Sequence, residues 1–119
     1  MGKAERHSEF VRAVLQHDVR EHPHPVPGIE SAAICDDTTG HYLIMYVGWS
    51  STYRARDVIV HISVRRDGIV QIEHDGTEES VVPALIAAGI DPDDIVLAFQ
   101  SPRSRVTVRD AITREGSVR

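Results

Sequence analysis

The residues with the most obvious capacity for chemistry are seven histidines, since neutral imidazole is a good metal ligand. His22 and His24 are the closest pair, and they lie in a proline-rich segment. An extended chain there would turn the two rings in different directions, and the sequence has no HExxH or comparable pattern of ligands. We therefore expect no metal site and no cofactor. A divergent metal-dependent hydrolase that uses histidines together with Asp75 is the alternative.

Acidic residues near position 75 allow two kinds of role. Asp75 and Glu78 could serve as metal ligands or as a general acid and base. They also lie where a helix is expected to begin, at the spacing of a capping box. Thr77 is an equally good N-cap, and Ser80 would be the cap if Pro83 lies in the first helical turn. We favour helix capping over catalysis.

No side chain lies in the setting of an activated nucleophile. The sequence has no GxSxG and no glycine-rich loop that would cradle a phosphate. Cys35, the one cysteine, lies in an expected strand, where a thiol is usually buried and inert. Lys3, the one lysine, lies near the N-terminus, and arginine stays protonated and cannot act as a base. We expect no catalytic residues, and so a protein that is not an enzyme.

Aromatic residues gather around one expected hairpin. Tyr42, Tyr46, Trp49 and Tyr53 follow one another within 12 positions. Such side chains can anchor a protein interface, and packing in the core is the alternative. Trp49 is the best interface candidate, because it lies at the end of a strand and polar residues follow it.

The charge of the chain disfavours general attraction to nucleic acid or to an anionic membrane. It has 13 basic and 18 acidic residues and a net charge of −5 at pH 7. Only a local basic patch would reverse this, and the C-terminal segment is rich in arginine. A solvated tail is the simpler interpretation, and DNA binding is the alternative. The arginines concerned are Arg103, Arg105, Arg109, Arg114 and Arg119.

The composition predicts a protein of the reducing cytoplasm. A lone cysteine permits no disulfide within the chain. Residues 1–9 are polar and lack the apolar core of a signal peptide, and no later apolar run approaches the roughly 20 residues of a membrane span. With 119 residues, 41% hydrophobic and 26% charged, the chain is expected to fold as one domain, alone or with copies of itself.

Hydrophobic periodicity predicts an α+β domain with the element order α-β-β-β-β-α-β. Residues 4–21 carry apolar side chains at three- and four-residue spacings, typical of an amphipathic helix, and the prolines that follow should end it. Four strands joined by short turns can pair as an antiparallel meander, before a second helix and a final strand. The expected strands are residues 31–35, 41–49, 58–64, 69–74 and 95–99.

Turn residues separate these elements. Asp67-Gly68 indicates a two-residue hairpin turn between the third and fourth strands. Gly89 fits the left-handed position after the second helix, and Asp91 followed by Pro92 predicts one further helical turn. The last strand could present an open sheet edge, which would allow homodimerisation through residues 95–99.

A set of short segments runs through residues 28–105 in a distinctive order. They are Tyr46-Val47-Gly48-Trp49, then Arg54 and His61 ahead of a hairpin, Asp75-Gly76-Thr77-Glu78, Ala88-Gly89-Ile90, Asp94-Ile95-Val96-Leu97-Ala98-Phe99, and finally Pro102 and Arg105. Each segment alone is a weak signal, but unrelated domains rarely share all of them at these separations. The set resembles the XisI family of fdxN-element excision controlling factors.

The resemblance implies a small α+β protein of cyanobacterial genome rearrangement, which acts alongside a site-specific recombinase and a companion protein, XisH. Because XisH looks like an endonuclease-type protein, the resemblance implies a XisH-like partner and a regulatory, non-catalytic role. The candidate interaction positions are those that carry the family's segments. They are Trp49, Arg54, His61, Asp75, Thr77, Glu78 and Arg105.

The chain departs from the family pattern in two places. Gln71 is found where the family typically has Trp, and Arg109-Asp110-Ala111-Ile112 replaces an aromatic-containing ending. If the family's partner surface uses those aromatics, the partner differs here. We divide the chain into an N-terminal helix and linker (1–27), a family core (28–105) and a divergent tail (106–119).

Overall fold

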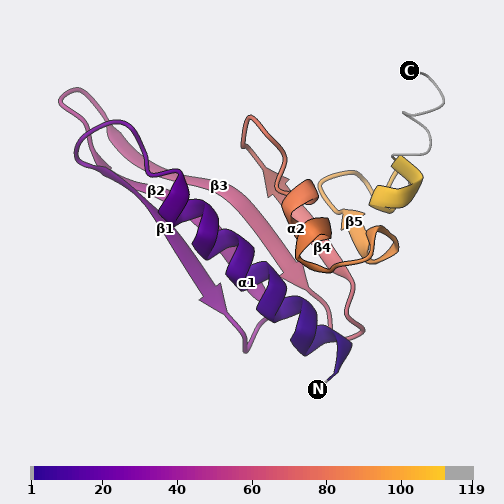
Figure 1. The fold of residues 1–119 in the computed structure, drawn as a ribbon. Coiled ribbons are helices and arrows are strands. Elements are labelled where there is room, and N and C mark those ends of the chain that lie inside the picture. The colour runs from indigo at the N-terminus through magenta and orange to yellow at the C-terminus, as the bar shows by residue number, and fades with distance from the viewer. Residues whose placement is uncertain (1, 112–119) are drawn as a thin grey trace.

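Helix α1 (Lys3–Glu21) is the first element of a computed structural model that describes residues 2–111 (Figure 1). Its apolar stripe includes Val11 and Leu15, four residues apart and both fully buried. The helix ends at Glu21, ahead of a segment whose prolines lack amide donors. The predicted helix is therefore confirmed. No helix within residues 2–111 has the length and apolar character to cross a membrane.

Five strands form one sheet in the order β1-β2-β3-β4-β5. β1 to β4 pair antiparallel, which confirms the predicted meander, whereas β5 lies parallel to β4. A parallel neighbour needs a crossover connection, and α2 provides it. The elements are β1 (Ile29–Asp36), β2 (His41–Trp49), β3 (Arg54–Val64), β4 (Val70–Asp75), α2 (Val82–Ala88) and β5 (Ile95–Leu97). The predicted α+β class and element order are confirmed, with a mixed sheet.

The turn between β3 and β4 is longer than the sequence predicted. Val64 pairs with Val70, so five residues connect the two strands, and the predicted two-residue turn is wrong. Gly68 donates its amide to Arg65 O at 2.9 Å and has a φ of 91°, a left-handed conformation that favours glycine. Asp67 accepts the amide of Ile69 at 3.1 Å. The Asp-Gly pair therefore ends a longer turn.

α2 begins later than a cap at Asp75 or Thr77 would place it, and Pro83 lies in its first turn, as the alternative with Ser80 expected. Its first residue is Val82 and Pro83 is the second, where an amide would lack an intrahelical partner. At its other end Gly89 has a φ of 125°, as predicted for the residue after the helix. A 3-10 turn, η1 (Pro92–Asp94), follows, and Asp91 accepts the amide of Asp93 at 2.8 Å, which confirms the predicted cap. β5 ends at Leu97, two residues before the predicted end.

Both helices pack on the same face of the sheet (Figure 1). The buried cluster joins α1 and α2 to alternate residues of β2, β3, β4 and β5. No helix or strand of residues 2–111 covers the other face. The cluster consists of Val11, Leu15, Tyr42, Ile44, Val60, Ile62, Val64, Val70, Ile72, Val81, Leu85, Ile90, Ile95 and Val108.

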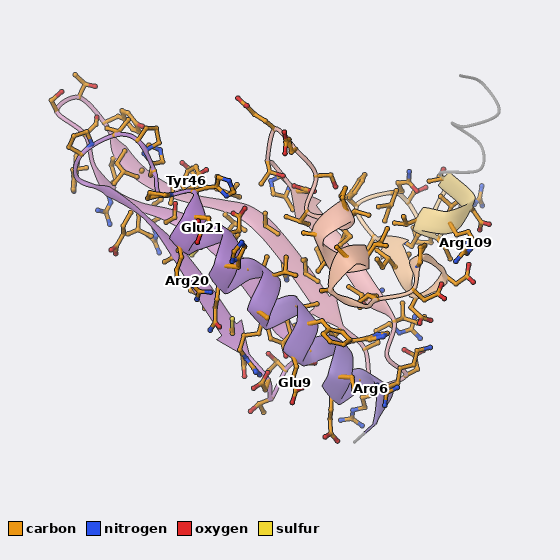
Figure 2. All side chains as sticks on the ribbon, viewed as in Figure 1. Arg6, Glu9, Arg20, Glu21, Tyr46 and Arg109 are labelled. Atoms are coloured by element: carbon orange, nitrogen blue, oxygen red, sulfur yellow. The ribbon has the colours of Figure 1, made fainter. Side chains whose placement is uncertain are left out.

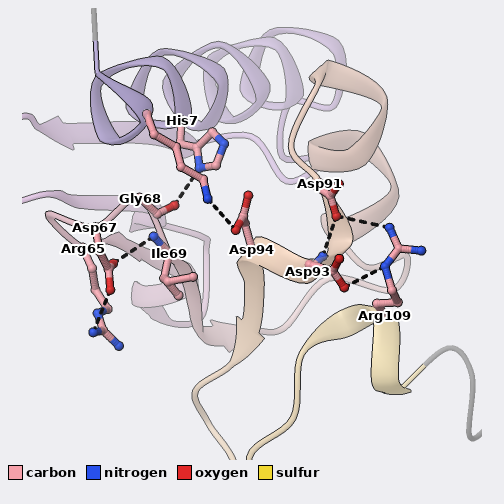
Figure 3. Close-up of polar contacts among 10 residues, drawn as sticks. His7, Arg65, Asp67, Gly68, Ile69, Asp91, Asp93, Asp94 and Arg109 are labelled. Carbon is pink, nitrogen blue, oxygen red and sulfur yellow. Dashed lines mark hydrogen bonds and ion pairs between the residues drawn. The ribbon is translucent and has the colours of Figure 1, made fainter.

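Polar contacts join the start of α1 to turns that lie far away in the sequence (Figure 3). The Nδ1 atom of His7, a buried residue, lies 2.6 Å from Gly68 O in the β3–β4 turn. Lys3 donates from Nζ to Asp94 at 2.8 Å. These contacts hold the N-terminus of α1 against the turns at its end of the sheet.

The outer edge of β5 is partly occupied. Val96 forms an antiparallel bridge with Thr107, and Leu97 donates its amide to Val106 O at 3.3 Å. Homodimerisation through an open edge at residues 95–99, as the sequence suggested, would have to displace this segment. The prediction of an open edge there is therefore wrong.

Candidate interaction surface

The residue pair Trp49 and Arg54 lies at one end of the β2–β3 hairpin. We call residues 49–54 the tip. The indole of Trp49 is 63% exposed, and the guanidinium carbon of Arg54 lies 5.7 Å from the ring centroid, within the range of a cation–π contact. Ser50 Oγ accepts the amides of Thr52 at 3.0 Å and Tyr53 at 2.9 Å, which orders the turn. The predicted interface candidate is therefore exposed on an ordered hairpin.

Two glycines that the sequence analysis gave no separate role support the tip. Gly48 has a φ of 144°, and a Cβ atom on it would lie 2.0 Å from Gly28 O. On Gly28 a Cβ atom would lie 2.3 Å from Trp49 O. Only glycine allows the linker and β2 to approach this closely. In the sequence, the only indication that Gly48 matters was its place in the segment Tyr46-Val47-Gly48-Trp49, which resembles the XisI family.

The proline- and histidine-rich linker packs on the sheet beside the tip. His24 meets the ring of Tyr46 edge-on, with 4.6 Å between centroids and 83° between planes. The His24 Nδ1 atom also accepts the amide of Val26 at 3.0 Å. Figure 2 labels Tyr46 close to the C-terminal end of α1. Its ring therefore belongs to the packing between helix, linker and sheet, as the core-packing alternative expected.

His61 lies on the sheet face that the helices leave open. It pairs across the strands with Leu43, and its Nε2 atom is 2.9 Å from His41 Nδ1. Burial lowers the pKa of His61, and the neighbouring imidazole of His41 lowers it further. Within residues 2–111 no group of three metal-ligating side chains comes together, so the histidine-based hydrolase has no support in this part of the chain.

Asp75 organises the loop between β4 and α2 and does not cap the helix as predicted. Its Oδ1 accepts the amide of Thr77 at 3.2 Å, and its Oδ2 accepts the Ser80 hydroxyl and the Val81 amide, both at 3.0 Å. Ser80 in turn accepts the amide of Val82 at 3.1 Å. The capping-box prediction is wrong because α2 begins at Val82, six residues later than a cap at Asp75 would place its first residue.

The two other candidates in this segment differ in their surroundings. Thr77 Oγ1 lies 2.5 Å from Asp75 Oδ1 and 2.5 Å from Glu79 O, so its hydroxyl belongs to the same loop network. Glu78 is exposed next to it. Asp75 and Thr77 thus act together in holding the loop, whereas the side chain of Glu78 remains at the surface.

Arg105 is bound to the backbone. Its guanidinium donates to Ala98 O at 2.9 Å and to Gln100 O at 3.1 Å, which closes the turn after β5. Arg109 forms ion pairs with Asp91 and Asp93 (Figure 3). Two of the arginines in the predicted basic patch are therefore engaged locally.

The remaining arginines of that segment do not change this result. Arg103 is exposed, and Arg114 and Arg119 lie outside the described residues. The DNA-binding alternative gains no support from residues 2–111, because the arginines that the structure ties down face carbonyl groups or carboxylates.

The one cysteine lies on the sheet face that α1 covers. Cys35 pairs with the buried Tyr42, and burial raises the pKa of its thiol. A raised pKa keeps the sulfur protonated and weakens it as a nucleophile. This agrees with the prediction of an inert cysteine in a strand.

The fold and these surfaces define a small α+β protein in which two helices cover one face of a mixed five-stranded sheet and an aromatic–arginine pair is exposed at one end. The chain belongs to the XisI family, since the family model described as XisI protein matches residues 1–112. The resemblance inferred from the sequence is therefore confirmed.

Two solved structures from Anabaena variabilis ATCC 29413 are similar to this one. A XisI-like protein has a TM-score of 0.77 and 25% sequence identity, over 86% of this chain and 92% of that chain. The fdxN element excision controlling factor XisI has a TM-score of 0.67 and 24% identity, over 86% of this chain and 97% of that chain. Among curated proteins, none matches the sequence.

Proposed function

We propose that this chain is a XisI-like regulatory protein of the cytoplasm, which binds a XisH-like, nuclease-type partner and thereby controls the excision of a DNA element. Family membership supports the general role, because the family model covers residues 1–112. One similar structure is described as an fdxN element excision controlling factor. The partner follows from the family resemblance and is an inference for this chain.

The observation that carries the binding role is the exposed pair at the tip. Trp and Arg are the residue types most enriched among the few side chains that dominate protein interfaces. Trp49 is the most exposed of the large hydrophobic residues in the described part of the chain, at 63%. It lies beside Arg54 on a turn that Ser50 orders, so little conformational entropy is lost when a partner covers it.

The non-catalytic part of the proposal is supported by what the polar candidates already do. Asp75 accepts hydrogen bonds from the loop before α2, and Arg105 donates to two carbonyl groups. A general base must be free to reach a substrate proton, and a catalytic arginine must be free to reach a developing charge. The polar atoms of Asp75 and Arg105 are held in hydrogen bonds that stabilise the fold, whereas catalysis would need these atoms free.

The test is co-purification with the product of an adjacent gene. The chain, carrying an affinity tag, is expressed together with a XisH-like protein from the same genome. We expect the two to elute as one complex. In Trp49→Ala or Arg54→Ala variants, affinity should fall about 30-fold or more, since removal of a dominant interface side chain costs about 2 kcal/mol or more. Isothermal titration calorimetry measures the dissociation constant.

Phe99→Ala is the matched control for the tip variants. Phe99 is also a large exposed hydrophobic residue, at 57%, but it follows β5 at the opposite edge of the sheet from β1. Its variant should bind the partner normally. No complex with the wild-type chain would refute the partner, and equal affinity of the Trp49 and Phe99 variants would refute the tip. Cleavage of DNA by the chain alone would refute the non-catalytic role.

A further inference from the structure

The sheet face opposite the helices, which we call the outer face, carries an apolar stripe along β2. Leu43, Met45 and Val47 alternate with the buried residues of this strand and are half-buried. Beside the stripe, Ile34 on β1 is 45% exposed and Val58 on β3 is 40% exposed. An antiparallel sheet with one solvated face usually has polar side chains there. The composition of the outer face is therefore typical of a surface that another molecule covers.

Cross-strand pairing arranges the outer face in rows. Each row has one side chain from β1, one from β2 and one from β3. The rows are Glu30–Val47–Arg56, Ala32–Met45–Val58, Ile34–Leu43–His61 and Asp36–His41–Ser63. The residues on the β1 side and the β3 side of a row thus differ in charge or in size.

We propose that the outer face binds a second copy of this chain, face to face, about a two-fold axis that runs along β2. Such an axis lays β1 of one copy over β3 of the other. Glu30 then meets Arg56 of the other copy twice in the dimer, because a two-fold interface repeats each contact. The stripe on β2 meets itself.

The size of the side chains supports this pairing. Small Ala32 lies over larger Val58, so the two surfaces can interdigitate without a gap or a clash. In the last row, Asp36 lies over Ser63, whose buried hydroxyl donates within its own chain to Gln71 and Glu73, so this row adds no hydrogen bond between the copies. The rows of Glu30 with Arg56 and of Ala32 with Val58 therefore offer complementary partners when the face is laid on a copy of itself.

The charges of the outer face are available for such contacts. Glu30 and Arg56 are exposed. Within residues 2–111, no ion pair joins either of them to another side chain. They lie on opposite sides of Val47, two strands apart, or about 10 Å at the usual strand spacing. A second copy brings each next to an opposite charge that its own chain does not supply.

The expected area predicts a weak dimer. Three strands at about 4.8 Å spacing and about 30 Å in length give roughly 400 Å² of flat area per copy. Two copies reach roughly 800 Å² of flat area, below the about 1,000 Å² that a stable specific interface usually exceeds, which places this contact among weak or transient interfaces. We therefore expect a dissociation constant in the micromolar range, and the experiment must span concentrations on both sides of it.

Sedimentation equilibrium over about 1 to 300 μM measures the association of the purified chain. The wild type should pass from monomer to dimer over this range. Met45→Glu places a carboxylate at the centre of the stripe, twice per dimer, and should weaken association about 100-fold or more. Arg20→Glu changes an exposed residue on α1 and should leave it unchanged. Circular dichroism and thermal unfolding check that both variants remain folded.

A charge exchange tests the orientation of the two copies. Arg56→Glu alone should weaken the dimer about 10-fold or more, because it sets Glu30 against a like charge in two places. Adding Glu30→Arg to the same chain should restore the wild-type dissociation constant. Recovery is expected only if the two positions meet across the interface, so failure of the double variant to recover would overturn the proposed axis.

The remaining outcomes decide between a second copy and another occupant. A wild-type chain that stays monomeric throughout the range overturns the proposal. So does a dimer that Met45→Glu leaves intact. If hydrogen exchange on β2 slows only when the XisH-like protein is added, the outer face binds that protein and not a second copy. If the monomeric Met45→Glu variant binds the XisH-like protein with wild-type affinity, then the partner does not need the outer face, and the surface that binds the partner is distinct from the one that forms the dimer.

Discussion

At the scale of the residue, several candidates turned out to stabilise the backbone around them. Asp75 and Arg105 are both charged and both lie in segments that resemble the XisI family, yet their polar atoms are taken up by nearby groups. Trp49 and Arg54 are different, since they lie exposed at the tip. The spacing of residues in the sequence could not separate these cases, because it does not say where the hydrogen-bonding partners are.

Asp75→Ala tests the loop network directly. The substitution leaves the Val81 amide and the Ser80 hydroxyl without their acceptor. We expect the free energy of unfolding to fall by about 1 to 3 kcal/mol, as for the loss of hydrogen bonds to a charged group. Urea unfolding measures it. Glu78→Ala is the matched control, because Glu78 is exposed in the same loop, and it should change stability by less than about 0.5 kcal/mol.

The titration of His61 provides a pH test. Its pKa is lowered from 6.5, first by burial and then by His41. The native state therefore binds fewer protons than the unfolded state, so the contribution of His61 to stability is complete above pH 6.5 and falls as the pH drops towards the folded pKa. NMR titration of the ring should give a pKa below 6.5. In His41→Gln the pKa should rise but stay below 6.5, and a value of 6.5 or more in the wild type would contradict the burial.

At the scale of the element, the ends of helices and strands followed local chemistry where the partners were close in sequence. Gly89 ends α2 and Asp91 caps η1 as predicted, since each acts within three residues. The start of α2 did not follow the local capping pattern, because Asp75 accepts hydrogen bonds from groups up to six residues away and so holds a loop ahead of the helix. Short-range capping was predictable, and the length of the loop was not.

Gly48→Ala tests the contact between linker and sheet. A methyl group would collide with Gly28 O, and the φ of 144° is unfavourable for alanine. We expect a loss of about 2 kcal/mol or more in the free energy of unfolding, from urea denaturation. Gly2→Ala is the control, since a Cβ atom there meets nothing within 4 Å. Similar stability of the two variants would show that the linker does not depend on this close approach.

At the scale of the whole molecule, the placement of both helices on one face determines which surfaces remain for binding (Figure 1). β2 has apolar side chains on both faces, a pattern typical of a strand that lies inside a sheet or is covered on both sides. The structure confirms that it lies between β1 and β3. Its helix-facing residues Tyr42 and Ile44 are buried, while the stripe on the other side is covered by no helix or strand of residues 2–111.

The sequence by itself determined the α+β class, the order of the elements, most of the turns and membership of the XisI family. Periodicity and turn residues act over a few positions, so they can be read along the chain. Only the tertiary structure decided that β5 lies parallel to β4, that Asp75 holds a loop, that Gly48 touches Gly28, and that both helices of residues 2–111 lie on the same sheet face. The sheet arrangement and the contact between Gly48 and Gly28 depend on residues far apart in the sequence, whereas the partners of Asp75 lie within six residues but beyond the reach of a helix cap. The free energy of such contacts comes from packing in three dimensions, which the local pattern of residues does not record.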